Sequence, residues 1–175
     1  MPTTPKERWL EGALDVLERQ GHTRLTLARV CAHMGQTKGA FYHHFANVPE
    51  LHLALIAYWE QRQTDGLLEA SMASESKDPI DILSRVVRWP VESAIRAWQP
   101  THEDARRACD AVDHRRVLTL ATRYRQAPRE VSLGLARVEY AAWLGQHMVL
   151  ADSPTQASDH ELMREALSAW ATAQG

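Results

Sequence analysis

Side chains that can hydrogen-bond to a nucleic acid gather in one short stretch near the N-terminus, between residues 26 and 45. Thr37 and Lys38 open the second half of this stretch, and Tyr42, His43 and His44 follow within one further turn of helix. Lysine and hydroxyl groups donate to phosphate oxygens, and polar side chains also read base edges in a groove. These residue types in this order therefore predict contact with a nucleic acid.

Two short helices joined by a tight turn are expected to position these side chains. Thr26 caps a first helix that Gly35 ends, and Thr37 caps a second helix over about residues 38–45. Gly35 suits the left-handed backbone that such a turn needs. The residues spaced to form the small core beneath both helices are Val30, Met34, Phe41 and Phe45. The pattern predicts a helix-turn-helix, whose second helix enters the major groove.

The run Thr26-Leu-Ala-Arg-Val-Cys-Ala-His-Met-Gly-Gln-Thr-Lys-Gly-Ala-Phe-Tyr-His-His-Phe45 resembles the signature of TetR-family regulators. The resemblance continues through Asn47, Glu50 and Leu51 and covers about residues 7–59. It implies that Lys38, Tyr42 and His44 contact the DNA backbone or bases, and that Thr26 binds a phosphate.

Geometry alone adds further candidates for contact with DNA. Arg29, Thr37 and His43 are placed to reach base edges, Arg29 by a bidentate bond to guanine. Gly39 and Ala40 are small enough for close backbone approach, and Ala40 could meet a thymine methyl group. The predicted DNA-binding set is Thr26, Arg29, Thr37, Lys38, Gly39, Ala40, Tyr42, His43 and His44.

Some of these residues also have ordinary structural interpretations. Tyr42 could cover the core with its ring, Arg29 could be an exposed helix residue, and His43 and His44 could be solvated. Adjacent helical histidines point about 100 degrees apart, so the pair is not expected to share a metal ion, and no metal site is predicted.

Two positions depart from the family pattern. Val48 stands where TetR-like sequences usually carry a lysine that reaches a phosphate, and Gln36 replaces the usual aliphatic residue of the turn. Loss of one phosphate contact predicts weaker, less salt-dependent DNA binding. Over residues 1–50 six basic residues face five acidic ones, so the charge count supports DNA binding only weakly.

Helical periodicity runs through the whole chain, which predicts an all-α fold. An N-terminal three-helix DNA-binding domain, residues 1–47, is joined by a long fourth helix to an all-helical ligand-binding and dimerisation domain, residues 48–175. The expected helices are 6–20, 27–34, 38–45, 48–75, 79–98, 101–111, 112–125, 128–150 and 158–173, with a break over 74–79 and a loop over 152–155.

The role of the second domain is what the resemblance implies, and dimerisation has an independent argument, because reading two adjacent major grooves requires two recognition helices about 34–36 Å apart. Its last two helices would pair with those of a second copy, and a pocket would lie between the fourth helix and residues 79–140. The candidate dimer residues are Val131, Leu135, Val138, Ala142, Leu162, Ala166, Ala169 and Trp170. The candidate ligand-binding residues are Trp59, Trp89, Trp98, Tyr124, Tyr140, Trp143 and His147. Both sets could instead belong to the monomer core.

A run of arginines stands out in the second domain: Arg106, Arg107, Arg115, Arg116, Arg123, Arg125 and Arg129. Such a run is usually solvated or paired with acids. It could also attract an anionic ligand or extend positive potential toward DNA.

Composition is that of an ordinary globular protein, with 45% hydrophobic and 24% charged residues and a formal net charge of -2 over 175 residues. Cys31 and Cys109 lie far apart in apolar patterns, which predicts two reduced core thiols. A secretory signal and a membrane-spanning stretch are both absent from the pattern, so a cytoplasmic protein without a membrane partner is expected.

The expected function is that of a homodimeric repressor that a small molecule releases from a double-stranded, palindromic DNA operator. The alternative is a DNA-binding regulator of the same fold that a protein partner controls or that acts without a ligand. A small helical enzyme is the third possibility, and the recognised catalytic motifs are absent; His102-Glu103 and Asp113-His114 are isolated pairs. No enzyme activity and no cofactor are expected.

Overall fold

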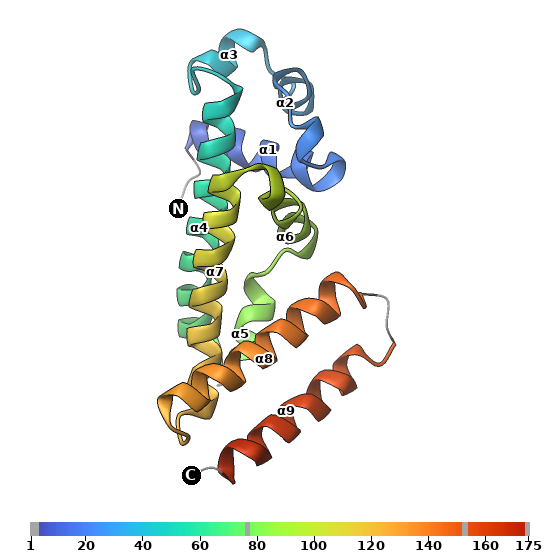
Figure 1. Ribbon diagram of the computed structural model, residues 1–175. Helices are drawn as coiled ribbons and strands as arrows, with labels where there is room; N and C mark the ends of the chain where they lie inside the picture. Colours follow the sequence, from blue (N-terminus) through green and yellow to red (C-terminus); the bar gives the residue numbers. More distant parts are fainter. Residues whose placement is uncertain (1–3, 76–77, 152–153, 174–175) are drawn as a thin grey trace. The chain divides into compact units, whose positions relative to one another are not determined.

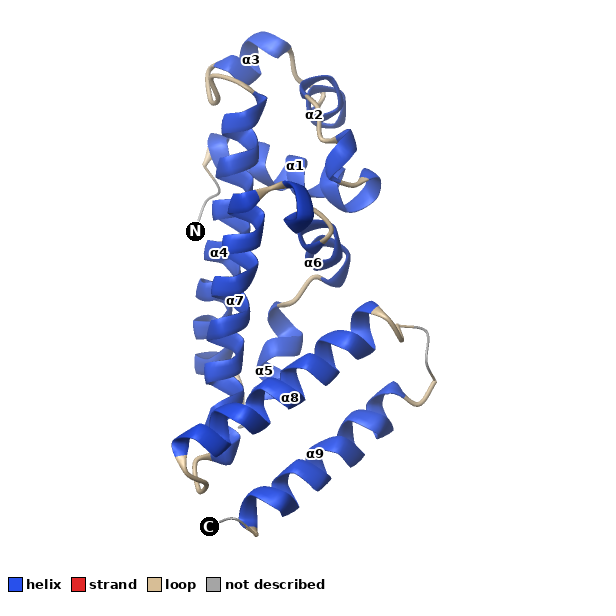
Figure 2. Cartoon of the chain, in the orientation of Figure 1, coloured by secondary structure: helices blue, strands red, loops and turns tan. Residues whose placement is uncertain are grey.

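The computed structural model describes residues 4–75, 78–151 and 154–173, and every regular element among them is a helix (Figures 1 and 2). An all-α fold was predicted and is confirmed. The chain forms two compact units, Met1–Asp65 with Arg88–Ala111, and Gly66–Val87 with Val112–Gly175. The division into functional domains at residue 47 stays a prediction. None of the described helices combines the length and apolarity needed to cross a membrane.

The first unit contains the N-terminal helices. Its elements are α1 (Pro5–Gln20), the short η1 (His22–Arg24), α2 (Leu27–Met34), α3 (Lys38–Tyr42), the first part of α4 (Val48–Ala73), α6 (Trp89–Arg96), η2 (Gln99–Thr101) and the start of α7 (Glu103–Ala121). Thr4 and Glu7 cap α1 reciprocally, because each side chain accepts a hydrogen bond from the other residue's backbone N–H. The apolar stripe of α1, including Leu14 and Leu17, is buried.

The second unit contains the C-terminal helices. Its elements are the ends of α4 and α7, then α5 (Pro79–Val86), η3 (Thr122–Tyr124), α8 (Arg129–Met148) and α9 (Gln156–Thr172). Helices α8 and α9 lie side by side as a hairpin (Figure 1). The side chain of Asp78 caps α5 by accepting a hydrogen bond from the Ile80 N–H at 3.0 Å.

Three predicted helix boundaries were wrong. The expected helix 79–98 is two helices, because Pro90 has no N–H to donate and residues 87 and 88 are extended. The expected break at residue 111 is absent, since α7 continues through a stretch without glycine or proline. Helix α3 ends at Tyr42, although the Phe45 N–H still bonds to the Phe41 carbonyl at 3.1 Å. The expected breaks over 74–79 and 152–155 include residues 76–77 and 152–153, which lie outside the described residues.

Candidate nucleic-acid interface

The turn between α2 and α3 is built by three local features. Thr26 accepts a hydrogen bond from the Arg29 N–H at 3.4 Å, and Thr37 accepts one from the Ala40 N–H at 3.2 Å, so both helices begin at capped threonines. Gly35 ends α2 in the left-handed region, with φ of 62°. The following N–H, of Gln36, returns to the Cys31 carbonyl at 3.0 Å. The caps and the glycine predicted from the sequence are therefore confirmed.

A small aromatic core holds α3 in place. Phe41 is fully buried, with its ring edge-to-face against Trp9 of α1 at 5.7 Å and tilted against Phe45 at 5.3 Å. Val30 is also fully buried, whereas Met34 is only half-buried. Because α3 has five residues and cannot stand alone, this packing fixes its direction.

All nine predicted DNA-binding residues lie on α2, on α3 or beside their ends, and none of them is fully buried. The exposed ones are Thr26, Arg29, Thr37, Lys38, Gly39, Tyr42 and His43, and the half-buried ones are Ala40 and His44. Tyr42 is 56% exposed, and its ring also meets that of the buried Phe41 edge-on at 5.4 Å. Their roles in binding DNA stay predictions.

His44 and Arg29 each contact a residue of α1. His44 lies with its ring 6.2 Å from that of Trp9, which orients the imidazole at the surface. The guanidinium of Arg29 donates to the side-chain oxygen of Gln20. An exposed hydrogen bond of this kind exchanges readily with water, so Arg29 stays available to a base or a phosphate.

The segment of the chain that forms α2 and α3 is basic, a signal that the charge count over residues 1–50 hides. Residues 19–49 contain Arg19, Arg24, Arg29 and Lys38 and not a single aspartate or glutamate. The acids of the N-terminal region lie earlier, on α1, or at Glu50. The cations of this segment favour the approach of a polyanion, although one carboxylate of α1, that of Asp15, lies 3.3 Å from His33 of α2.

Two side-chain hydrogen bonds fix the start of helix α4. Asn47 accepts a hydrogen bond from the Glu50 N–H at 2.8 Å, and the Glu50 carboxylate accepts one from the Ala46 N–H at 2.7 Å. Val48, in the place of the family's usual lysine, is half-buried. The start of α4 is well fixed but offers no cation at that position.

Three histidines surround Trp98, a cluster that the sequence did not predict. His22 stacks on the indole at 5.7 Å, and His52 and His102 meet it edge-on at 4.9 and 5.0 Å. A ring nitrogen of His52 lies 3.0 Å from the Leu25 carbonyl, and burial lowers the pKa of His52. The cluster joins the loop before α2 to α4 and to the segment between α6 and α7.

Arg88, the residue before α6, contacts α1 of the first unit. Its guanidinium lies 2.7 Å from Glu18, 3.6 Å from Asp15 and 3.7 Å from Glu11, all on α1. These ion pairs hold Arg88 against α1, the helix that α2 and α3 also pack against.

The seven predicted ligand-binding residues are divided between the two units, and their role in binding a ligand stays a prediction. Trp59, Trp89 and Trp98 belong to the first unit, and Tyr124, Tyr140, Trp143 and His147 belong to the second. A cavity of about 370 Å³ lies in the second unit between α5, α8 and α9. Trp143 and His147 line it, and the other five residues do not. The cavity is also bounded by α9, which the prediction had left out.

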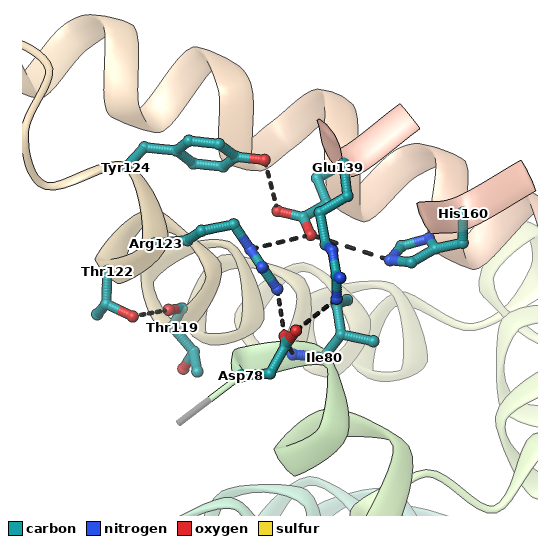
Figure 3. A network of polar contacts seen from close by, with 9 residues as sticks. Asp78, Ile80, Thr119, Thr122, Arg123, Tyr124, Glu139 and His160 are labelled. Carbon is teal, nitrogen blue, oxygen red and sulfur yellow. Dashed lines mark hydrogen bonds and ion pairs between the residues drawn. The ribbon is translucent and has the colours of Figure 1, made fainter. Parts of the chain in front are cut away.

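A buried polar network lies next to this cavity (Figure 3). Glu139 is fully buried and accepts a hydrogen bond from the Tyr124 hydroxyl at 2.9 Å, with Arg123 Nε at 3.3 Å. Asp78 pairs with Arg123 and with Arg164, the latter at 2.5 Å. Burial raises the pKa of Glu139, against the lowering effect of Arg123.

The arginine run is largely paired rather than free. Arg106 lies 3.0 Å from Glu103, and Arg107 pairs with Asp104. Arg116 is buried and donates to the Tyr140 hydroxyl at 3.1 Å. The interpretation of the run as cations paired with acids is the one that these contacts favour.

The predicted dimer residues divide between surface and core. Leu135 is buried within the protomer, and Val131 and Ala142 are half-buried. The other five are exposed: Val138, Leu162, Ala166, Ala169 and Trp170. Cys31 and Cys109 are buried thiols outside any disulfide bond of the described residues, as predicted. No group of His, Cys, Asp or Glu side chains in the described part of the chain is arranged to hold a metal ion.

Comparison with known proteins finds a family model that matches the N-terminal part of the chain and solved structures that share its fold. Residues 10–55 match the family model described as bacterial regulatory proteins of the tetR family. A transcriptional regulator from Rhodococcus sp. Rha1 is 17% identical, with a TM-score of 0.69 over 98% of this chain and 96% of that one. The multidrug binding protein EbrR, complexed with imidazole, is 20% identical, with a TM-score of 0.61 over 95% of this chain and 94% of that one. No curated protein matches the chain. Such identities show a shared fold.

Proposed function

We propose that the chain is a TetR-like transcriptional regulator that acts as a homodimeric repressor released from its operator by a small molecule, since residues 10–55 match the family model of the tetR regulatory proteins. The observation that carries the DNA-binding part is the exposed face of α2 and α3, two helices that contain Arg29 and Lys38 and no aspartate or glutamate, with both helices capped and α3 packed on Phe41. No catalytic step is part of this proposal.

In the proposed complex α3 enters the major groove. Lys38 and Thr26 bind phosphates, which positions the protein, and Tyr42, His43 and Arg29 reach toward base edges or the backbone. Gly39 and Ala40 leave room for the helix to approach the DNA.

Two copies are needed to read two successive major grooves, about 34 Å apart. The exposed apolar face of α8 and α9 supports this pairing: Leu162 is 69% exposed, Val138 53% and Trp170 50%. Apolar side chains of this size gain most from burial against a second copy. The proposed homodimer is formed by this face.

Release by a small molecule is supported by the cavity in the second unit. A structural neighbour, the multidrug binding protein EbrR, was solved with imidazole bound. A ligand that binds one conformation of the dimer more tightly shifts the population toward it. In the proposed mechanism the favoured conformation has the wrong spacing of its two α3 helices for the operator.

Lys38→Ala and Tyr42→Ala are each expected to weaken binding to a selected operator about tenfold, the effect of one lost contact of 1–2 kcal/mol. The Lys38→Ala variant should also reduce the salt slope of binding by about one. Fluorescence anisotropy of labelled duplex DNA at several salt concentrations gives both values. Unchanged circular dichroism shows that the fold is intact.

Arg125→Ala, at an exposed position of the second unit, is the matched control and should bind like the parent. Parent-like affinity of both Lys38→Ala and Tyr42→Ala would show that α3 is not the recognition helix.

Leu162→Arg is expected to raise the dimer dissociation constant at least about tenfold, because a charge replaces an apolar side chain at the proposed interface. Sedimentation velocity over a range of protein concentrations measures the change. Leu68→Arg, at another leucine of the second unit that is 64% exposed, is the control and should leave the association unchanged. A parent that sediments as a monomer, or equal association of both variants, contradicts the assigned interface.

A further inference from the structure

Three histidine rings surround the indole of Trp98 in the first unit and form with it the Trp98 cluster. His22 of η1 stacks on the indole, with ring centres 5.7 Å apart and planes 16° apart. His52 of α4 and His102, between η2 and α7, meet it edge-on at 4.9 and 5.0 Å. Trp98 is buried and the three histidines are half-buried. Because the four rings come from three separate segments, their packing fixes these segments against one another.

The Trp98 cluster holds the segment that leads into α2. Nε2 of His52 lies 3.0 Å from the carbonyl oxygen of Leu25, a distance at which the neutral imidazole donates its N–H. Leu25 is buried, and the next residue, Thr26, is the N-cap of α2. The other ring on this segment is that of His22. The N-terminus of α2, with Thr26 and Arg29, is therefore positioned by contacts of two ionisable rings.

A positive charge on the Trp98 cluster has little compensation. Among the described residues, Asp104 is the only carboxylate within ion-pair distance of it, at 3.8 Å from Nδ1 of His102, and Asp104 also pairs with Arg107. Nδ1 of His102 is buried and makes no hydrogen bond within the described part of the chain. A charge on His102 is thus only partly balanced, and His52 has no described ion pair at all.

The acidic groups on the surrounding helices have partners of their own. They are Glu18 of α1, which lies 2.7 Å from Arg88, Glu92 of α6, which lies 2.7 Å from Arg96, and Glu50 of α4, which accepts a backbone N–H. The remaining charged group of η1 is the exposed guanidinium of Arg24, a cation. The surroundings therefore favour neutral histidines.

The pH range in which the cluster changes follows from these contacts. Burial lowers the pKa of His52, and the charges of His102 and His22 lower it further, against the raising effect of the bond to the Leu25 carbonyl. The packed arrangement is complete above about pH 6.5, the ordinary pKa of a histidine. Its stabilisation is lost as the pH falls through the lower pKa that His52 has in the fold. Two imidazolium rings on one indole also repel each other.

We propose that the Trp98 cluster is an acid-sensitive switch, in which protonation of its histidines frees the segment before α2 and the chain releases its DNA. The switch itself rests on contacts within the first unit, while the release of DNA rests on the proposed function. His43 and His44 act in the opposite direction, because positive charge on the exposed face strengthens binding to phosphates. A variant of the cluster is therefore needed to isolate its effect.

Fluorescence anisotropy with the duplex that the parent selects tests the proposal at about pH 7.5 and about pH 5.5, on either side of the ordinary histidine pKa. Glutamine in His52→Gln can still donate to the Leu25 carbonyl but does not ionise. The ratio of the dissociation constants at the lower and the higher pH should be about fivefold larger for the parent than for His52→Gln, the order expected for one ionisation that the fold disfavours. His114→Gln, at an exposed histidine of α7 in the second unit, is the control and should keep the parent's ratio.

Urea unfolding at both pH values, followed by circular dichroism, gives a measure that needs no DNA. The urea midpoint of the parent should fall more between the two pH values than that of His52→Gln. His22→Gln, which keeps the bond from His52 to Leu25, should also reduce the fall, and it replaces His52→Gln if that variant does not fold.

Equal falls of the urea midpoint in the parent and both cluster variants overturn the switch. Unequal falls with equal ratios of the dissociation constants overturn its link to DNA release. A parent that binds no duplex at the higher pH refutes the proposed repressor, and the urea midpoints then still decide whether the switch exists.

Discussion

Phe41→Ala is expected to lower the free energy of unfolding of the first unit by about 3–5 kcal/mol, the usual cost of removing a fully buried phenylalanine. Phe41 is 0% exposed and meets Trp9 and Phe45 at 5.7 and 5.3 Å. Its ring is the part of α3 that reaches the core, so the substitution leaves a cavity beneath the helix.

The effect on DNA binding should be larger than the loss of stability alone explains. Helix α3 has five residues, too few to persist without packing, and Lys38 and Tyr42 on it would lose their fixed positions. Urea denaturation followed by circular dichroism gives the free energy, and anisotropy gives the affinity for DNA. Phe41→Leu keeps most of the volume and should cost no more than about 1.5 kcal/mol. Equal stability of Phe41→Ala and the parent would mean that Phe41 does not anchor α3.

Asp78→Ala is expected to lower the free energy of unfolding of the second unit by about 3–5 kcal/mol, because it strips two largely buried guanidinium groups of their shared carboxylate. The side chains of Arg123 and Asp78 are 17% and 20% exposed, and that of Arg164 is 28% exposed. Glu139 is a poorer partner for Arg123, since burial raises its pKa and disfavours its ionised form. Asp78 therefore supplies most of the compensation.

Asp78→Asn separates the two roles of this residue. Asparagine keeps the oxygen that caps α5 by accepting from the Ile80 N–H, a bond of about 1 kcal/mol, but carries no charge. Urea denaturation should place Asp78→Asn between the parent and Asp78→Ala. A stability of Asp78→Asn equal to that of the parent would show that the cap matters and the ion pairs do not.

The parts of the fold that depend on local chemistry could be predicted from the sequence. Thr26, Thr37 and Asn47 cap helices through bonds to residues three positions away, and Gly35 is read from the turn that it allows. The break before α6 could also have been predicted from Pro90, since proline excludes an uninterrupted helix.

The remaining features depend on packing between distant segments. The Trp98 cluster joins His22, His52 and His102, and no spacing in the sequence relates them. Asp78 and Arg164 are 86 positions apart, and their contact follows from where α5 and α9 lie. Aromatic content suggested a ligand site, but only the fold decides which tryptophans face a cavity: Trp143 does so, whereas Trp98 packs among histidines.

The most direct test of DNA recognition by α3 is a selection from a random library of duplex DNA, made in parallel with the parent and with the Lys38→Ala/Tyr42→Ala double variant. The parent should enrich a palindromic sequence with half-sites about one helical turn apart. The double variant should fail to enrich that sequence while keeping its circular dichroism spectrum. Enrichment of nothing by the parent, or of the same sequence to the same extent by the double variant, would contradict the assignment of α3 as the DNA-reading helix.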